Sequence, residues 1–311
     1  MSGDTDTVPP DCFYLGVDGG GSKTLAIVVD AHGNEHGRAV AGSANYSAVG
    51  LERAVAHVLA AAEEAARAAG TCLPLAAAWL GLAGVDRPAD HTILLPHLSS
   101  LANAVHLTND AELLLSALPG QAGVVLIAGT GSIAVGRSSR GATTRAGGWG
   151  HILGDEGSGY DIGRRALVAA TRFADGRGEP TLLLPRILRA WHLTEANELI
   201  SHVYYDEDKA AIARLAPLVL QAAREDDHAA RRIVRRAAIE LALAAVTVGN
   251  RLAYRAAPLP IALGGSLLLQ DAGFRADVLR AISRHHLLGD IAVVEQPAFS
   301  AAQAAIALAA P

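Results

Sequence analysis

The chain opens with apolar segments that alternate like strands and stop at glycine-rich turns. Residues 13–18 form a short apolar run that ends in three glycines, and residues 24–30 form a second run. The turn at residues 31–34 then leads into a third expected strand over 36–41. Three strands joined by tight turns predict an antiparallel meander at the start of a domain.

Helical and strand patterns alternate over the next eighty residues. Apolar positions that recur near every 3.6 residues predict helices, and short apolar runs predict strands. The expected helices are 51–69, 89–101 and 111–118, and the expected strands are 76–82 and 105–108. Pro119 and Gly120 then interrupt the pattern, which predicts a domain boundary.

Beyond this boundary the opening pattern repeats. The sequence predicts a strand over 123–128, a Gly-Thr-Gly-Ser turn at 129–132, and strands over 133–137 and 143–146. Both halves therefore begin with strand, glycine-rich turn, strand, turn and strand, as an internally duplicated fold would. Later segments are helical over 157–256, with strands at 258–263 and 291–294 and a closing helix at 300–309.

The duplicated pattern predicts an α/β fold with two domains around a cleft. The expected domains are residues 1–118 and residues 119–299, with residues 300–311 packing back on the first. A length of 311 residues agrees with two domains. A hydrophobic content of 51% supplies a real core and excludes a disordered chain.

Charge and cysteine content narrow the class of function. The net charge of -5 without a dominant basic patch argues against nucleic acid as the main partner. The densest basic stretch, residues 231–236, follows the acidic residues 225–227 and is interpreted as a solvated helix face of mixed charge. Two cysteines, Cys12 and Cys72, are too few for a disulfide framework or a four-cysteine metal site.

The sequence predicts neither a targeting signal nor a membrane-spanning segment. The first ten residues lack a charged-then-apolar signal pattern, and each apolar run falls short of the ~20 residues of a membrane span. The sequence therefore predicts a soluble, cytoplasmic protein without a membrane partner.

The first glycine-rich turn is a candidate phosphate site. Residue 22 is Ser where a Walker P-loop requires Lys, and the following segment is a strand pattern where a P-loop opens a helix. A β-hairpin can still offer backbone N–H groups to phosphate, and Asp18 at the strand end could hold Mg²⁺ directly or through water. The candidate phosphate-binding residues after Asp18 are Gly19, Gly20, Gly21, Ser22, Lys23 and Thr24.

Two later glycine turns extend this idea. Gly129, Thr130, Gly131 and Ser132 have the same form in the second half, so the two turns together predict a clamp for a nucleotide polyphosphate. Gly264, Gly265 and Ser266 connect a strand to a helix, where the backbone could approach an adenosine ring or simply pack the helix closely.

Two polar segments are candidates for catalysis and substrate binding. Asn109 and Asp110 follow a strand; they either cap the next helix or place a catalytic carboxylate that accepts the proton of an attacking hydroxyl. The segment 147–159 has six glycines around polar residues, and ordering such a flexible loop costs entropy that bound ligand would offset. Its acidic and serine residues could instead cap the helix that follows.

Together these motifs resemble the N-acetylglucosamine kinase family, within the BadF/BadG-type group of the actin, hexokinase and Hsp70 superfamily. The resemblance covers nearly the whole chain. Its most specific part is Gly148-Trp-Gly-His-x-x-Gly-Asp-Glu-Gly-Ser158, supported by the segments 18–22, 108–110 and 129–132. It implies the two-domain actin-like ATPase fold, with a duplicated βββαβαβα core and a helical insertion in the second domain.

The resemblance also implies roles for individual residues. Asp18 and the glycines after it match the first phosphate motif, with the Mg²⁺-associated aspartate, and Gly129–Ser132 match the second. Gly264–Ser266 match the adenosine motif, and Asp110 matches the base that deprotonates the sugar 6-hydroxyl. The implied sugar contacts are Asn45, Trp149, Gly150 and Asp155, with Asn109, Gly148, His151 and Glu156 beside them.

The implied activity is ATP-dependent phosphorylation of an amino sugar, N-acetylglucosamine first, by a homodimer that uses Mg²⁺. Glucosamine and N-acetylmuramic acid stay open as substrates. A different class within the superfamily, the ATPase activators of acyl-CoA dehydratases and reductases, would require cysteines that hold an iron–sulfur cluster. Neither Cys12 nor Cys72 lies at the second-domain position that such a cluster needs.

Overall fold

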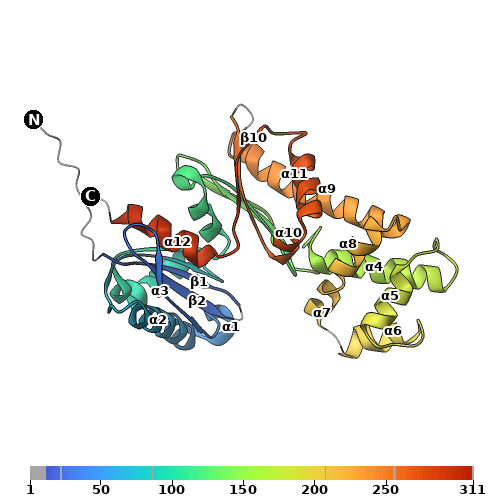
Figure 1. Cartoon of the computed structure of the whole chain (residues 1–311), viewed down its shortest axis with the longest axis horizontal. Coiled ribbons are helices and arrows are strands. Elements are labelled where there is room, and N and C mark those ends of the chain that lie inside the picture. Colours follow the sequence, from blue (N-terminus) through green and yellow to red (C-terminus); the bar gives the residue numbers. More distant parts are fainter. Residues whose placement is uncertain (1–11, 22, 86, 207, 255–256, 310–311) are drawn as a thin grey trace, which may run out of the picture. The chain divides into compact units, whose positions relative to one another are not determined.

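The chain divides into two compact units (Figure 1). Unit 1 consists of Met1–Gln121 with Gln296–Pro311, and unit 2 consists of Ala122–Glu295. The computed structural model describes residues 12–21, 23–85, 87–206, 208–254 and 257–309. Each unit is built on its own five-stranded sheet.

The sheet of unit 1 has the strand order β3-β2-β1-β4-β5. Strands β1 and β2 are antiparallel, as are β2 and β3, whereas β4 runs parallel to β1 and β5 runs parallel to β4. Its strands are β1 (Tyr14–Gly19), β2 (Thr24–Val29), β3 (Glu35–Ala41), β4 (Leu75–Leu82) and β5 (Ala102–Thr108).

Alternating side chains of β1 explain how this sheet is covered on both faces. Leu15 and Val17 join the apolar cluster that includes helix α2 (Leu51–Ala68), whereas Tyr14 joins the cluster of helix α12 (Pro297–Ala305). Successive residues of a strand point to opposite faces, so one strand serves both clusters. Figure 1 shows α2 and α12 on opposite sides of the sheet.

The remaining elements of unit 1 are short. They are the helices α1 (Tyr46–Val49) and α3 (Pro88–Leu98) and the 3₁₀ turns Ser99–Leu101, Glu112–Ala117, Pro119–Gln121 and Ile306–Leu308. The α-helix expected over residues 111–118 is wrong, because this segment is the 3₁₀ turn Glu112–Ala117. The N–H of Leu114 bonds the carbonyl of Ala111, a three-residue spacing that is tighter than the α-helical one.

The sheet of unit 2 has the order β10-β9-β6-β7-β8. Strands β6, β7 and β8 form an antiparallel meander, and β9 and β10 extend the sheet in parallel from β6. Counted from its first strand, unit 2 therefore repeats the connectivity of unit 1, and the duplicated α/β fold is confirmed. The strands are β6 (Gly123–Ala128), β7 (Ser132–Arg137), β8 (Thr143–Gly147), β9 (Leu259–Gly264) and β10 (Leu288–Val293).

Unit 2 differs from unit 1 by a helical insertion between β8 and β9, as the sequence predicts. The long helix α9 (His228–Arg251) packs on the meander and on helix α11. Among the described residues, no helix has the length and apolar character to cross a membrane. The other elements are α4 (Gly159–Ala174), α5 (Leu183–Ala190), α6 (Glu198–Ser201), the π-helical turn His202–Asp206, α7 (Lys209–Ala213), α8 (Ala216–Arg224), α10 (Ser266–Gln270) and α11 (Ala272–Ile282).

Candidate functional site

The parallel strands of unit 1 bring two separate motifs to one edge of the sheet. In the strand register, Asp18 of β1 pairs with Gly81 of β4, and Gly81 pairs with Thr108 of β5. The carboxyl ends of β1 and β5 therefore lie at the same level, so Asp18 and the Asn109–Asp110 pair share this edge. In open α/β sheets this is the edge where ligands bind.

Asp18 lies in β1, directly before the turn that the first glycine motif forms. The hairpin between β1 and β2 is closed by a bond from the N–H of Gly20 to the carbonyl of Lys23 (2.9 Å). Burial first, and then the negative charge of Asp110, raise the pKa of Asp18, and Lys23 opposes both, so that the resulting pKa is about 6. Two carboxylates thus sit close enough to repel, which is the kind of oxygen-rich position that a hard divalent cation stabilises.

The raised pKa of Asp18 has a consequence for stability that can be measured. Because the folded chain holds this proton more tightly than the unfolded chain, the stabilisation is present at low pH and is lost as pH rises through about 6. Asp18→Asn is therefore expected to stabilise the ligand-free protein at pH 7.5 relative to wild type, by on the order of 2 kcal/mol more than at pH 4.5. Urea unfolding of both proteins at the two pH values measures this; equal differences at both would contradict it.

Asn109 and Asp110 divide the two roles that their position allows. The Oδ1 atom of Asn109 accepts a hydrogen bond from the N–H of Glu112 (2.6 Å), so Asn109 caps the following turn. The Oδ1 atom of Asp110 accepts from the N–H of Ala111 (3.0 Å), and the side chain is half-buried. The Asn109 cap holds the turn, and the Asp110 carboxylate lies beside it at the same edge.

Asn45 carries a buried polar atom that points to a ligand. Its Oδ1 atom is buried and has no hydrogen-bond partner among the residues that the structure describes. The preceding segment is tied to the first hairpin, since the N–H of Ala44 bonds the carbonyl of Gly20 (3.2 Å) and the Ser43 hydroxyl donates to the same oxygen (3.3 Å). A buried acceptor left unpaired costs stability, so a donor from a bound molecule would complete this site.

The second glycine turn is held from two sides in unit 2. The N–H groups of Gly159 and Tyr160, at the start of α4, donate to the carbonyls of Gly129 (2.8 Å) and Thr130 (3.2 Å). The buried Asp155 carboxylate accepts from the backbone N–H of Ser132 (3.1 Å). These bonds tie the turn to the start of α4 and to the loop after β8, and the contact that the structure gives to Asp155 is with this turn.

The third glycine turn lies beside the second. Gly265 has a φ of +85°, and a Cβ atom there would stand 2.4 Å from the carbonyl oxygen of Ala128, so only glycine fits. Gly129 and Thr130 of the second turn and Ser266 of the third line one cavity of about 680 Å³, a volume in the range of small-molecule sites. The other walls come from α7, α8 and the segment 266–271, among them Ala213, Arg214, Pro217 and Gln270.

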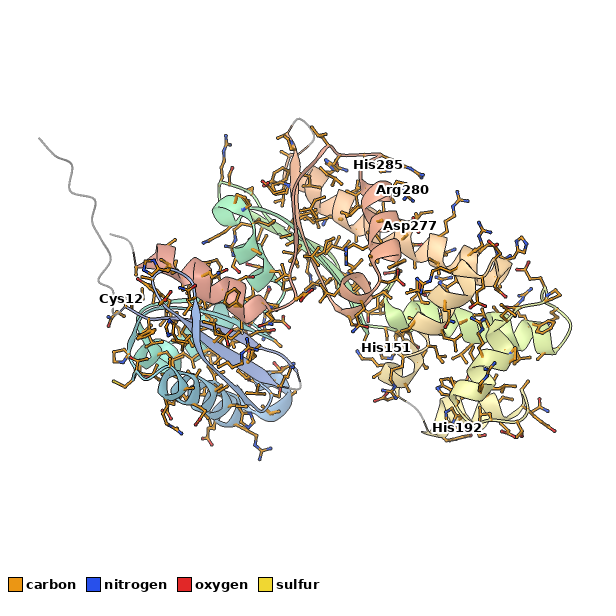
Figure 2. All side chains as sticks on the ribbon, viewed as in Figure 1. Cys12, His151, His192, Asp277, Arg280 and His285 are labelled. Atoms are coloured by element: carbon orange, nitrogen blue, oxygen red, sulfur yellow. The ribbon has the colours of Figure 1, made fainter. Side chains whose placement is uncertain are left out.

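The glycine-rich loop after β8 exposes some of its side chains and buries others. The Trp149 side chain is 63% exposed, and the guanidinium of Arg145 lies over its ring at 5.1 Å. His151, labelled in Figure 2, is half-buried and packs edge-on against Tyr160 at 5.1 Å, a contact typical of a structural role. Glu156 is exposed, while its backbone carbonyl accepts from the Ser132 hydroxyl (2.8 Å).

The residues predicted from the sequence and the residues that line the site in the structure differ in part. Ser22 lies outside the described residues. Sequence patterns did not single out Arg214 and Gln270, which line the cavity, because a polar residue on a helix carries no local signal of what it faces.

Among the described residues, no three His, Cys, Asp or Glu side chains form a metal-binding group. Mg²⁺ in nucleotide enzymes commonly uses one or two carboxylates with phosphate and water, which Asp18 and Asp110 fit.

The duplicated sheets and glycine-rich turns define a two-domain α/β ATPase of the actin-like class. The chain belongs to the BadF/BadG/BcrA/BcrD ATPase family, which it matches over residues 15–309.

Proteins that are similar to this chain in sequence are named as sugar kinases. The chain is 36% identical over 241 residues to the N-acetylmuramic acid/N-acetylglucosamine kinase of Clostridium acetobutylicum, covering 76% of this chain and 79% of that one. It is 33% identical over 233 residues to the N-acetyl-D-glucosamine kinase of Dictyostelium discoideum, covering 70% and 72%. A crystal structure from Chromobacterium violaceum, provisionally described as an N-acetylglucosamine kinase, superposes with a TM-score of 0.70 at 29% identity, covering 97% and 100%.

Proposed function

We propose that this protein transfers the γ-phosphoryl group of ATP to the 6-hydroxyl of an amino sugar, with N-acetylglucosamine as the first candidate. The relatives named as N-acetylglucosamine and N-acetylmuramic acid kinases support this activity. The observation that carries it is the placement of Asp110 at the same sheet edge as the Asp18 hairpin. A base beside a phosphate-binding turn is what hydroxyl phosphorylation requires.

Asp110 is the proposed general base. Its carboxylate accepts the proton of the sugar 6-hydroxyl as the oxygen attacks phosphorus, and the bond between the γ-phosphorus and the bridging oxygen of ADP breaks. Little covalent chemistry falls to the protein in such transfers, so positioning and electrostatic stabilisation supply most of the rate.

The nucleotide is proposed to occupy the cavity of unit 2. Gly129–Ser132 would meet its phosphates and Gly264–Ser266 its adenosine, because Gly129, Thr130 and Ser266 line that cavity. The Asp155 contact with Ser132 keeps the phosphate turn in place. In unit 1, Gly19–Gly21, Lys23 and Thr24 are proposed as the second set of phosphate contacts, with Ser22 retained from the sequence.

Asp18 is the proposed Mg²⁺ residue, with water completing the contact. A bound Mg²⁺ would neutralise charge that develops on the phosphate oxygens. The chain's own part is to supply the half-buried Asp18 carboxylate, whose ionised form is disfavoured until a cation arrives.

Sugar contacts are proposed from both units. In unit 1, the unpaired Oδ1 of Asn45 would accept a sugar hydroxyl, and Asn109 lies next to the base. In unit 2, the proposed contacts for the ring and the acetamido group are Gly148, Trp149, Gly150, His151, Asp155 and Glu156. The exposed Trp149 ring supports this role, since an aromatic face packs well on a sugar.

A panel of sugars tests the proposed activity and settles its substrate. ADP release is measured with ATP and Mg²⁺ on N-acetylglucosamine, glucosamine, N-acetylmuramic acid, N-acetylmannosamine and glucose. The expected result is strong turnover on an amino sugar, N-acetylglucosamine first, and weak turnover on glucose, which lacks the nitrogen substituent. Equal ADP release with and without every sugar would reject the kinase and favour an activator ATPase.

We also propose that the protein is a homodimer and that it is located in the cytoplasm. The helical surface of unit 2 is the proposed dimer face, and two cysteines, one exposed and one half-buried, accord with a reducing compartment. Sedimentation at several protein concentrations measures the oligomeric state directly.

A further inference from the structure

A second groove in unit 2 is lined by arginines. It lies along α9 and α11 and reaches the end of α8, with a volume of about 780 Å³. Figure 2 labels Asp277 and Arg280 on α11. The arginines that line the groove are Arg224, Arg231, Arg232, Arg235, Arg280 and Arg284.

The groove is positive in a chain that is negative as a whole. Six arginines but only two acidic residues, Asp271 and Asp277, line it. The complete chain carries a formal net charge of -5. A concave surface of one sign concentrates counter-ions, so the groove favours an anionic occupant.

Some of these arginines form ion pairs with carboxylates, which compensate their charge. Arg224 pairs with Asp271 (2.7 Å) and Arg280 with Asp277 (2.5 Å) inside the groove. Arg231 pairs with Asp226 (2.7 Å), as the mixed-charge interpretation of residues 225–236 predicts, and Arg232 pairs with Glu179.

Two arginines remain uncompensated. Within the part of the chain that the structure describes, Arg235 and Arg284 have neither a carboxylate partner nor a side-chain hydrogen bond, and both are exposed. They come from different segments, helix α9 and the turn after α11. An anion held between these segments would therefore find two guanidinium groups whose donors are not already used.

We propose that this groove is a binding site for a small phosphorylated metabolite, separate from the nucleotide cavity. Guanidinium groups form planar, bidentate hydrogen bonds with phosphate oxygens, which suits Arg better than Lys to such a role. The volume of the groove falls in the range of small-molecule sites. The site rests on this geometry and not on the proposed kinase activity.

The groove adjoins the nucleotide cavity without including its glycine turns. Leu220, Arg224 and Asp271 line both, whereas Gly129 and Ser266 line only the nucleotide cavity. The Arg224–Asp271 ion pair thus stands in the wall between the two. An anion that draws Arg224 away would leave the Asp271 charge facing the nucleotide cavity, so occupancy of the groove is expected to weaken nucleotide binding.

Inorganic pyrophosphate is the probe for the test. Its binding to the full chain is measured by calorimetry, and hydrogen exchange locates it. The variant is Arg235→Gln with Arg284→Gln, which breaks no observed ion pair; the matched control is Arg140→Gln with Arg189→Gln, two exposed arginines outside the groove.

The proposal predicts binding that falls about ten-fold or more in the groove variant, as charge-assisted hydrogen bonds are lost, and that is unchanged in the control. It also predicts slower exchange in the peptides of α9 and α11. Equal affinity in all three proteins, or no binding to wild type up to about 10 mM, would overturn the site. Pyrophosphate that bound only at the glycine turns would give the equal-affinity result and is rejected by the same comparison.

Discussion

Asp110→Asn is expected to lower the turnover number by about 10³-fold while the protein folds normally, because a general base supplies that order of rate. The amide oxygen of asparagine can still accept the hydrogen bond from the N–H of Ala111, so the local turn is retained. It cannot take a proton from the sugar hydroxyl. The measurement is steady-state ADP release with N-acetylglucosamine, beside thermal unfolding.

Asn109→Ala is the matched control for this substitution. It removes the cap on the Glu112 N–H and is expected to cost about 1 kcal/mol of stability, with a far smaller loss of turnover. Asp110→Asn should also let the pKa of Asp18 fall, since the Asp110 charge is one of the causes that raise it. Near-normal turnover in Asp110→Asn would remove Asp110 from the mechanism.

Gly16→Ala is expected to unfold unit 1 or destabilise it by about 3 kcal/mol or more, the upper range for overpacking a core. Gly16 lies in the middle of β1, where helix α12 crosses the strand. A Cβ atom there would stand 1.9 Å from the carbonyl oxygen of Ala298 and 2.4 Å from the backbone nitrogen of Ala302. Both are backbone atoms of one helix, so a rotamer change cannot relieve the contact. Urea unfolding measures the loss.

Gly21→Ala provides the comparison, because a Cβ atom at Gly21 meets no heavy atom within 4 Å. Its stability should stay within about 1 kcal/mol of wild type. If Gly16→Ala were equally well tolerated, the close packing of α12 on β1 would be wrong. Since Asp18 lies next to the last residue of β1, this packing also fixes the position of the candidate magnesium carboxylate.

The fold could be predicted from the sequence because the same strand pattern occurs in both halves of the chain. Strand patterns around 13–18 and 24–30 return around 123–128 and 133–137, and the two sheets indeed share one connectivity. The helix expected at 111–118 failed because apolar spacing does not distinguish an α-helix from successive 3₁₀ turns in so short a segment. There the Asn109 side chain caps the turn by accepting a hydrogen bond from the N–H of Glu112.

Contacts between distant residues could not be predicted. Nothing local to Asn45 indicates that its Oδ1 atom is buried and unpaired, nor does the loop after β8 indicate that Asp155 bonds Ser132. The shared cavity of Gly129 and Ser266 arises because β6 and β9 are parallel neighbours, with Ile127 opposite Gly264. The arginine groove likewise depends on α9 and α11 lying together, although their arginines are far apart in sequence.

The fate of the γ-phosphoryl group tests the central claim most directly. Wild-type protein is incubated with ATP, Mg²⁺ and N-acetylglucosamine, and the products are followed by phosphorus NMR with proton coupling retained. The account predicts one sugar phosphomonoester per ADP, with a signal split by the two protons on carbon 6. Inorganic phosphate as the main product, formed at the same rate with or without the sugar, would contradict it.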